Sequence, residues 1–229
     1  MTDIHSHILQ NIDDGAVCIQ QALKLLHMQQ SDGVSKVMLT PHCNVNMIDI
    51  EKFIDKRACE YQKLMEHAKG FQIEISLGAE VMFSPQLLDI DLAPLCYSGT
   101  KNILIELPWS NLPPLLAEVL SQIKLSGYTP VLAHVERYRY LMRNLDLLKK
   151  LVRAGIYTHV NAESIIYNRK IALNLIKGDL AHMVASDAHS VDIRPPLLGK
   201  AMGIIRKKLG QNTAEMLIRN ANAIVKSDW

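Results

Sequence analysis

The residues of this chain that could perform chemistry begin near its first position, with His5 and His7 in the segment "TDIHSHILQNIDDG". In a β-strand, side chains two positions apart point to the same side, so two imidazoles in His-x-His spacing can bind one metal ion. The segment "SDAH" repeats this spacing with Asp187 and His189. Imidazole combined with carboxylate suits zinc, manganese, iron or nickel better than calcium or magnesium.

Other potential ligands stand at the ends of short apolar runs along the chain. They are His42, Glu80, Glu106, His134 and Asn161. With His5 and Asp187 they form a series spaced about 26 to 38 residues apart, which suits one strand and one helix per interval. A glutamate buried after an apolar run is costly without a partner, so Glu80 and Glu106 favour a nearby cation. The sequence therefore predicts a metal site.

Some neighbouring polar residues have ordinary structural explanations. Asp13 and Asp14 precede Gly15, and such a segment commonly starts a helix or a turn. We interpret Asp14 as a ligand and Asp13 as a structural residue. The remaining histidines lie inside helical patterns or out of phase with the strand ends, and we interpret them as structural or surface residues. They are His27, His67, His159 and His182.

The elements that must position these side chains follow an alternating pattern. Seven short runs rich in Val, Ile and Leu are predicted as strands, at 2–5, 36–42, 73–80, 102–108, 130–136, 157–163 and 182–189. Longer amphipathic segments are predicted as helices, including 17–33, 112–127, 198–210 and 213–226. Strands that alternate with helices indicate a parallel α/β fold, and in parallel barrels catalytic groups gather at the carboxyl ends of the strands. The G-x-G-x-x-G signature of a dinucleotide-binding fold is missing after the first run.

The composition is that of an ordinary globular protein. Hydrophobic residues make up 48% of the 229 residues and charged residues 21%, and we expect one domain. The net charge of +2 gives no electrostatic argument for nucleic acid. With no signal-peptide pattern and no long apolar run, we expect a cytoplasmic protein without stable membrane insertion. Its four cysteines form no C-x-x-C pair and are expected to be free thiols.

The ordered motifs resemble a known family. "DIHSHIL", "DDGA", "TPH", "GAE", "ILIELP", "GYTPVLAHVERY", "VNAES" and "VASDAHS" followed by "RPP" resemble the PHP (polymerase and histidinol phosphatase) superfamily. Within it they are similar to the bacterial manganese-dependent tyrosine-protein phosphatases of the CpsB/YwqE type. The motifs run from residue 3 to residue 196. The resemblance implies a distorted seven-stranded (β/α)7 TIM-like barrel, the PHP fold, in a single metallophosphatase domain over residues 1–229.

The resemblance also implies a site for three Mn²⁺ ions, with iron, zinc, cobalt or magnesium as substitutes. The implied ligands are His5, His7, Glu80 and Asp187 for the first ion, Glu80, Glu106 and His134 for the second, and Asp14, His42 and His189 for the third. In related phosphoesterases the position of Glu106 is often histidine. A carboxylate is a harder ligand, which fits manganese better than zinc.

Two arginines lie beside the ligand-bearing segments, Arg137 after "AHVE" and Arg194 after "SDAH". Guanidinium groups bind phosphate in bidentate fashion, so we expect both arginines to bind substrate. With His42 and Asp187 they form the predicted catalytic set. The chain departs from the family in having Val135 where proline is usual, and in lacking a basic residue in "VMFSP" after Glu80.

These residues predict a metal-assisted phosphatase, in which activated water attacks phosphorus without a covalent phosphoenzyme. The cysteine phosphatase pattern C-x5-R does not occur in the sequence. From the resemblance, the expected substrate is the phosphorylated tail of a bacterial tyrosine kinase that controls capsule or exopolysaccharide synthesis. The alternatives are a small-molecule phosphatase acting on a metabolite such as histidinol phosphate, and a metal-binding regulatory module with degraded catalysis.

Overall fold

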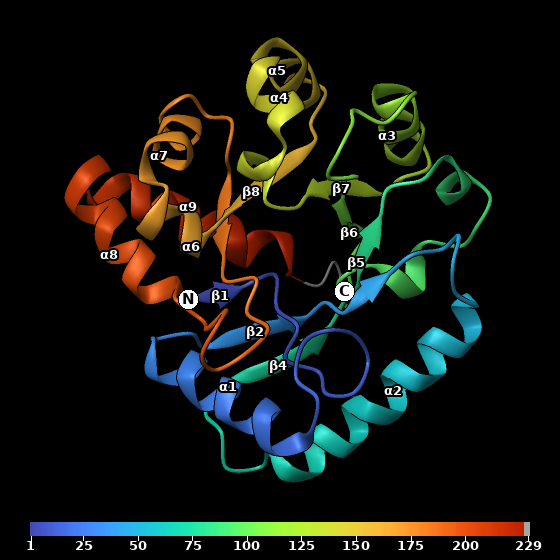
Figure 1. Cartoon of the computed structure of the whole chain (residues 1–229), viewed down its shortest axis with the longest axis vertical. Helices are drawn as coiled ribbons and strands as arrows, with labels where there is room; N and C mark the ends of the chain where they lie inside the picture. Colours follow the sequence, from blue (N-terminus) through green and yellow to red (C-terminus); the bar gives the residue numbers. More distant parts are fainter. Residues whose placement is uncertain (227–229) are drawn as a thin grey trace.

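The computed structural model describes residues 1–226, in which curled parallel strands lie inside a ring of helices (Figure 1). The strands are β1 (Thr2–Asp3), β2 (Lys36–Leu39), β3 (His42–Cys43), β4 (Glu74–Leu77), β5 (Glu80–Met82), β6 (Asn102–Glu106), β7 (Thr129–Leu132), β8 (Tyr157–Asn161) and β9 (Met183–Ala185). The helices are α1 (Ile19–Ser31), α2 (Ile50–His67), α3 (Leu116–Leu125), α4 (Arg139–Arg143), α5 (Leu145–Arg153), α6 (Ala162–Tyr167), α7 (Arg169–Lys177), α8 (Leu198–Leu209) and α9 (Gln211–Ile224). Short 3₁₀ helices are η1 (Pro85–Leu88), η2 (Ala93–Leu95) and η3 (Val135–Arg137).

The strands form two parallel sheets. The smaller sheet has the order β1-β2-β4, and the larger has the order β3-β5-β6-β7-β8-β9. The runs 36–42 and 73–80, each predicted as one strand, are both interrupted, so that β2 and β3, and likewise β4 and β5, follow one another along the chain. The parallel α/β class is therefore confirmed, whereas the predicted count of seven barrel strands is not, because six strands make up the larger sheet.

Both interruptions have local causes. Pro41 lies between β2 and β3 and carries no N–H for a sheet hydrogen bond. Gly78 lies between β4 and β5, where a Cβ atom would come within 3.0 Å of the Tyr97 ring and 3.2 Å of the Thr40 methyl group. The two breaks are neighbours, since the N–H of Gly78 donates to the carbonyl of Leu39 at 2.9 Å and that of Glu80 to Pro41 at 3.0 Å. The predicted ligands His42 and Glu80 follow these two breaks and are register partners in β3 and β5.

The first and last strands meet through the segments that follow them. Ser6 forms an isolated parallel bridge with Ala188. The N–H of His7 donates to the carbonyl of Ala188 at 2.8 Å, and the N–H of Asp187 donates to the carbonyl of His5 at 2.9 Å. These bonds place the two metal-binding motifs of the sequence, His-x-His and Asp-x-His, side by side.

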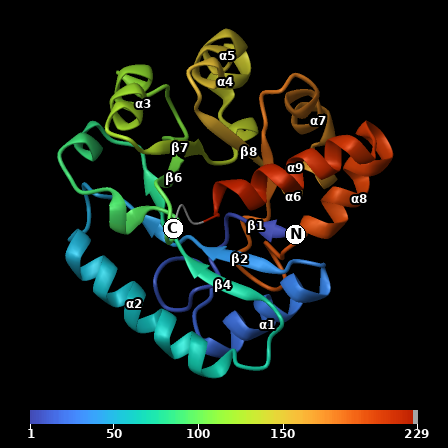
Figure 2. The same cartoon turned by 180° about the vertical axis from the view of Figure 1, so that it is seen from behind.

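The core has two parts because alternate side chains of each strand point to opposite faces. Val37 and Leu39 join the larger cluster, together with apolar side chains of the surrounding helices, whereas Met38 belongs to a smaller one. The smaller cluster includes Ala221, Ile224 and Val225 from α9 and the residue after it. Helix α9 crosses the strands in the view from behind (Figure 2) and covers this second face.

Most of the expected helices are present within a few residues of their predicted bounds. The segments 17–33, 112–127, 198–210 and 213–226 correspond to α1, α3, α8 and α9. Gly127 and Gly155 follow α3 and α5 with φ of +87° and +81°, the left-handed conformation that glycine adopts at little cost. Among residues 1–226, none of the helices has the length and apolar character needed to cross a membrane.

Candidate metal centre

Most of the predicted ligands lie at or just after the carboxyl ends of β1, β2, β4, β6, β7 and β9. His5 and His7 follow β1, His42 begins β3, Glu80 begins β5 and Glu106 ends β6. His134 follows β7, and Asp187 and His189 follow β9, while Asp14 comes from the loop before α1. Most of these side chains are buried, although Asp14 is 66% and His42 38% exposed. The site thus has a buried floor and an accessible side.

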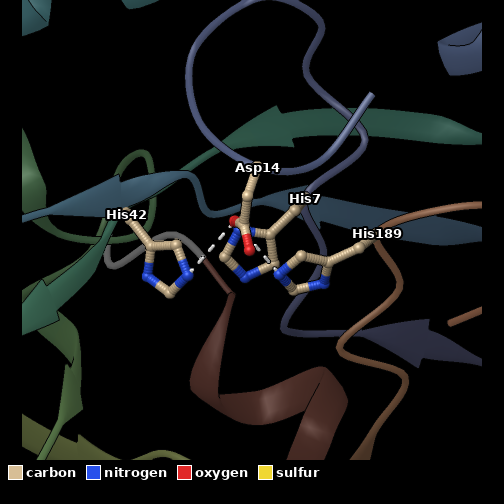
Figure 3. A group of neighbouring side chains, drawn as sticks. All are labelled: His7, Asp14, His42 and His189. Carbon is tan, nitrogen blue, oxygen red and sulfur yellow. Dashed lines mark ion pairs between the residues drawn. The ribbon is translucent and has the colours of Figure 1, made fainter. Parts of the chain in front are cut away.

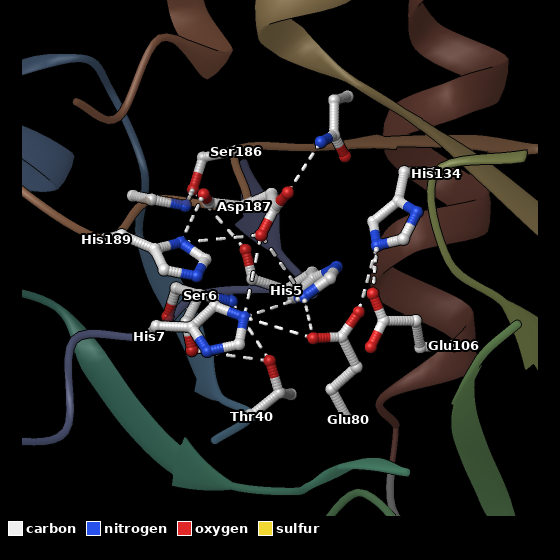
Figure 4. A network of polar contacts seen from close by, with 12 residues as sticks. His5, Ser6, His7, Thr40, Glu80, Glu106, His134, Ser186, Asp187 and His189 are labelled. Carbon is white, nitrogen blue, oxygen red and sulfur yellow. Dashed lines mark hydrogen bonds and ion pairs between the residues drawn. The ribbon is translucent and has the colours of Figure 1, made fainter. Parts of the chain in front are cut away.

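The first group consists of His5, His7, Glu80 and Asp187 (Figure 4). The Nε2 atoms of His5 and His7 are 3.0 Å apart, and each lies 3.2 Å from Glu80 Oε2. Each is also 3.5 Å from Asp187 Oδ1. Ligand atoms that surround one cation at about 2.0 to 2.2 Å are separated from each other by about 3 to 3.5 Å, so this group has the dimensions of a metal site.

The second group shares Glu80 with the first. His134 Nε2 lies 3.0 Å from Glu80 Oε1 and 3.6 Å from Glu106 Oε1. The two oxygens of Glu80 face different histidines, so this carboxylate could contribute to both the first and the second predicted ligand group. Glu106 and Glu80 lie on neighbouring strands, β6 and β5, which explains how their side chains meet.

The third group lies on the accessible side of the site. Asp14 Oδ1 is 3.5 Å from His42 Nε2 and 3.4 Å from His189 Nε2, and Figure 3 shows Asp14 between these two imidazoles. The other ring nitrogen of His42, Nδ1, is 2.9 Å from Glu80 Oε2. His7 lies close to the same group, with its ring stacked on that of His189 at 3.8 Å between centroids.

The donor set fits divalent transition metals. The described residues form four overlapping clusters that could hold a cation, and each combines imidazole nitrogen with carboxylate oxygen, which suits manganese, iron or zinc. In these clusters Glu106 joins Glu80 and His42, while His134 joins Glu80 and His5. Glu80 Oε2 and His189 Nε2 are buried and make no well-aligned hydrogen bond with any residue in 1–226. Buried polar atoms without such partners are costly unless another group binds them, and a cation would do so.

Hydrogen bonds from behind the site orient the predicted ligands. Asp13 Oδ2 lies 2.6 Å from His7 Nδ1 and also accepts the backbone N–H of His42 at 2.9 Å. His189 Nδ1 is 2.9 Å from the carbonyl of Asp187. When Nδ1 carries the ring proton, Nε2 has its lone pair free for a cation, which is the usual arrangement of metal-binding histidines. The structural role interpreted for Asp13 is therefore to orient the ring of His7 and the backbone of His42.

Two residues of β8 belong to this network: Asn161, which the sequence offered as a potential ligand, and His159, which it did not. His159, interpreted as structural, is fully buried, and its Nε2 lies 3.0 Å from Nδ1 of His5. Asn161 donates from its amide to Asp187 Oδ2 at 2.6 Å. The two positions are separated by one residue, and this alternation along a strand is the signal that could have identified His159.

Two predicted ligands have unusual backbone conformations. His134 has φ of +30° and Asp187 has φ of +54°, a region that residues other than glycine seldom occupy. Such strain is typically retained where the surrounding structure needs a side chain in one particular direction. The backbone at both positions therefore directs the side chain into the site.

Burial and the charges of neighbouring side chains together set the pKa values of the cluster. Burial alone would lower the pKa of His7, but Asp13 and Glu80 outweigh burial and raise that pKa well above its usual value. Burial would raise the pKa of Glu80, yet the surrounding histidines hold it well below its usual value. Burial and the neighbouring charge of His7 lower the pKa of His189 to about 4, so its imidazole is neutral near pH 7.

Both predicted substrate-binding arginines reach the site. Arg137 Nη1 lies 3.3 Å from Asp187 Oδ2, and Arg194 Nη2 donates to the same oxygen. The guanidinium of Arg137 also lies over the ring of Trp109, 4.5 Å from its centroid. Trp109 in turn stacks on His134 at 5.2 Å. Sequence reasoning missed Trp109, whose aromatic type and place after "ILIELP" were the available signal.

Both arginines line a cavity of about 340 Å³ that opens to solvent. The predicted ligands in its lining are Asp14, His42, Glu80, Glu106, His134 and Asp187. Cys43 also lines it, but burial raises the pKa of this thiol to about 11. Burial likewise raises the pKa of Cys96 to about 12. Neither thiol is ionised near pH 7, so the cavity offers no activated cysteine nucleophile.

A curled parallel α/β fold with histidines and carboxylates gathered at the strand ends is suited to metal-assisted hydrolysis. Residues 1–226 match the family "Capsular polysaccharide synthesis, CpsB/CapC", and the chain belongs to this family. It is 31% identical over 247 residues to the tyrosine-protein phosphatase CpsB of Streptococcus agalactiae, covering 100% of both proteins. It is 29% identical to the tyrosine-protein phosphatase YwqE of Bacillus subtilis, covering 99% of this chain and 92% of YwqE.

A solved structure gives the same relationship. One chain from the crystal structures of the metal-dependent tyrosine phosphatases YwqE of Bacillus subtilis and CpsB of Streptococcus pneumoniae superimposes on the present chain with a TM-score of 0.88. The two are 28% identical, and the match covers 100% of this chain and 96% of the other. The resemblance noted in the sequence is therefore confirmed.

Proposed function

We propose that this protein is a metal-dependent tyrosine-protein phosphatase. The observation that carries the proposal is the convergence of Arg137 and Arg194 with the candidate metal ligands on one open cavity of about 340 Å³. Membership of the CpsB/CapC family, whose relatives include tyrosine-protein phosphatases, supports it. The physiological substrate we propose is the phosphorylated tail of a bacterial tyrosine kinase that controls capsular polysaccharide synthesis.

We propose Mn²⁺ as the metal, with the three ligand groups as its sites. Bound divalent cations supply Lewis acidity toward phosphoryl oxygens and make water acidic enough to attack phosphorus near pH 7. The carboxylate at Glu106 supports manganese over zinc, because it adds a hard oxygen ligand 3.6 Å from a nitrogen of His134 and 3.6 Å from one of His42. Glu80 and Asp187 hold negative charge where the cations would sit.

The chain's own side chains then bind and orient the phosphoryl group. Arg137 and Arg194 approach from the side of Asp187 and can donate pairs of hydrogen bonds to the phosphoryl oxygens, whose charge they stabilise during transfer. The stack of Arg137 on Trp109 holds its guanidinium in place. The indole, 47% exposed at the rim, offers a flat surface to the aromatic ring of phosphotyrosine.

The open rim distinguishes the leading proposal from a metabolite phosphatase. A protein substrate needs a shallow, accessible site, whereas a small metabolite is usually enclosed. Asp14, His42 and Trp109 all line the cavity and remain partly exposed, which supports a protein substrate.

We also infer that residues 1–229 act as one domain built on a seven-unit barrel. The bridge between Ser6 and Ala188 supports this inference, as does the continuity of runs 36–42 and 73–80 across their breaks. A single cooperative unfolding transition, coincident by fluorescence and circular dichroism, is the expected result. Two separate transitions would contradict it.

The test of function is phosphate release by the manganese-loaded protein from a phosphotyrosyl peptide and from histidinol phosphate, measured side by side. EDTA and the variant His42→Ala serve as controls for metal dependence. We expect metal-dependent turnover of the peptide far above that of the metabolite. Preference for histidinol phosphate would overturn the assigned substrate, and inactivity on both would overturn catalysis itself.

A further inference from the structure

A second cavity adjoins the catalytic one. It has a volume of about 430 Å³, and its wall shares Trp109 and Arg137 with the catalytic cavity. Beyond these two residues its lining comes from η3, from α4, α6 and α7, and from Asn168 between α6 and α7, none of which contributes a predicted metal ligand. We call this second cavity the arginine cleft, because it is lined by Arg137, Arg139 and Arg143.

The charge of the arginine cleft is strongly positive. Its lining holds three guanidinium groups and one carboxylate, that of Glu136, and the guanidinium of Arg137 also pairs with Asp187 of the catalytic cavity at 3.3 Å. That carboxylate is already engaged, since Glu136 Oε1 accepts the backbone N–H of Asn161 at 2.9 Å and the hydroxyl of Ser164 at 2.7 Å. The cleft therefore keeps an excess of positive charge on its exposed side.

The side chains of Arg139 and Arg143 contribute no polar contact to the described part of the fold. Both are exposed, and neither makes an ion pair or a side-chain hydrogen bond with any residue in 1–226. They stand four positions apart on α4, where like charges are neighbours and destabilise a helix. An anion bound between them would remove this repulsion and could accept paired hydrogen bonds from each planar guanidinium.

We propose that the arginine cleft binds an anionic side chain of the peptide substrate, next to the phosphotyrosine held in the catalytic cavity. This inference rests on the proposed function and specifies its substrate class as an acidic phosphopeptide. Because the two cavities share Trp109 and Arg137, a peptide could run from one into the other across the indole. An extended chain advances about 3.3 Å per residue, so an acidic residue a few positions from the phosphotyrosine can reach the cleft.

The first experiment measures kcat and KM for phosphotyrosyl peptides in which one glutamate is moved through the positions around the phosphotyrosine, against a peptide without acidic flanking residues. We expect one or two glutamate positions to lower KM about tenfold, with kcat little changed, because the contact lies outside the reacting atoms. A parallel series with phosphoserine in place of glutamate distinguishes preference for a carboxylate from preference for a second phosphate. Equal KM values throughout both series would overturn the proposal.

The second experiment assigns the effect to the cleft. In Arg139→Gln/Arg143→Gln, we expect the KM advantage of the acidic peptide to disappear while turnover of the neutral peptide persists. The matched control is Lys150→Gln/Arg153→Gln, which removes the same charge from α5 outside the cleft lining. If the control lost the advantage equally, net charge rather than the cleft would explain it.

A binding measurement keeps this inference separate from the proposed catalytic activity. The chain has two tryptophans, so Trp229→Phe leaves Trp109 as the only one, at the wall shared by both cavities. In that background we expect an acidic peptide with unphosphorylated tyrosine to change Trp109 fluorescence with a dissociation constant that rises about tenfold in Arg139→Gln/Arg143→Gln. Loss of catalysis with retained binding would refute only the proposed function. Binding that is unchanged in the double variant would refute the cleft.

Discussion

Asp13 offers the sharpest test of the candidate site, because it contacts the metal centre only through other residues. Its Oδ2 lies 2.6 Å from His7 Nδ1 and accepts the N–H of His42 at 2.9 Å, while its Oδ1 accepts the N–H of Gly15 at 3.0 Å. One carboxylate therefore fixes a histidine of the first group and a histidine of the third. We predict that Asp13→Asn weakens metal binding without unfolding the protein.

The magnitude follows from the hydrogen bonds that change. Asparagine keeps one oxygen acceptor but loses the charge, and a hydrogen bond to a charged group contributes about 1.5 to 3 kcal/mol against about 0.5 to 1.5 kcal/mol for a neutral one. The amide nitrogen cannot accept the N–H of Gly15, which removes about 1 kcal/mol more. A total near 2 kcal/mol corresponds to about a 30-fold loss of Mn²⁺ affinity, which is within the 10- to 100-fold loss typical when a group that orients metal ligands is replaced.

The assay is competition for Mn²⁺ with a chromophoric chelator, followed by hydrolysis of para-nitrophenyl phosphate across a range of Mn²⁺ concentrations. We expect the activation curve of Asp13→Asn to shift to higher Mn²⁺, with much of the activity restored at saturation. Asp55→Asn is the control, since Asp55 is exposed on α2 and makes no ion pair with a residue in the described part of the chain. A shift of less than about twofold would refute the role assigned to Asp13.

Three further results are expected. Gly15→Ala should lower Mn²⁺ affinity at least about tenfold, because the Cβ of the alanine would lie 2.0 Å from the carbonyl oxygen of His7 and the loop must move. Chelator competition measures the affinity, and an unchanged value would contradict this prediction. Mn²⁺ affinity should rise with pH and continue to rise above about pH 6.5, the usual pKa of histidine. Burial lowers the pKa of His7, but Asp13 and Glu80 raise it overall, so a cation must displace the proton of His7. Calorimetry in two buffers would detect that proton release, and pH-independent binding without it would refute the argument. Replacing all four cysteines by serine should leave turnover per folded molecule within about twofold of the original value, since the thiols take no part in metal-assisted hydrolysis. A phosphate-release assay, with circular dichroism as the control for folding, tests this prediction. A large loss of turnover in a folded variant would indicate a cysteine-dependent step.

The sequence was sufficient to predict which residues lie together in the candidate site, because polar residues at the ends of apolar runs can be recognised in the sequence alone. His5, Glu80 and Asp187 each follow or interrupt an apolar run, and the structure brings their side chains within 3.5 Å of a common imidazole nitrogen, His7 Nε2. The parallel α/β class followed from the same alternation of runs and amphipathic segments.

The sequence could not show the contacts that depend on packing. The breaks at Pro41 and Gly78 occur side by side in space, and nothing in either run alone shows that they are neighbours. The structural interpretation of His159 was incomplete, because its contact with His5 joins positions 154 residues apart. Trp109 was missed for a similar reason, since its stacking on His134 and Arg137 exists only once β6 and β7 are paired.

The meeting of the first and last strands also determines the order in which this protein can be assembled. Asp3 accepts the N–H of Ser186 at 2.9 Å across 183 positions of the chain, and the same junction brings His5 beside Asp187. Contacts between such distant segments form late and slowly during folding, because a long loop must close before they stabilise anything. No nascent fragment that lacks the last strand can complete the first ligand group. Tight metal binding should therefore appear only when synthesis has passed Asp187, which makes the cation a reporter of the finished fold.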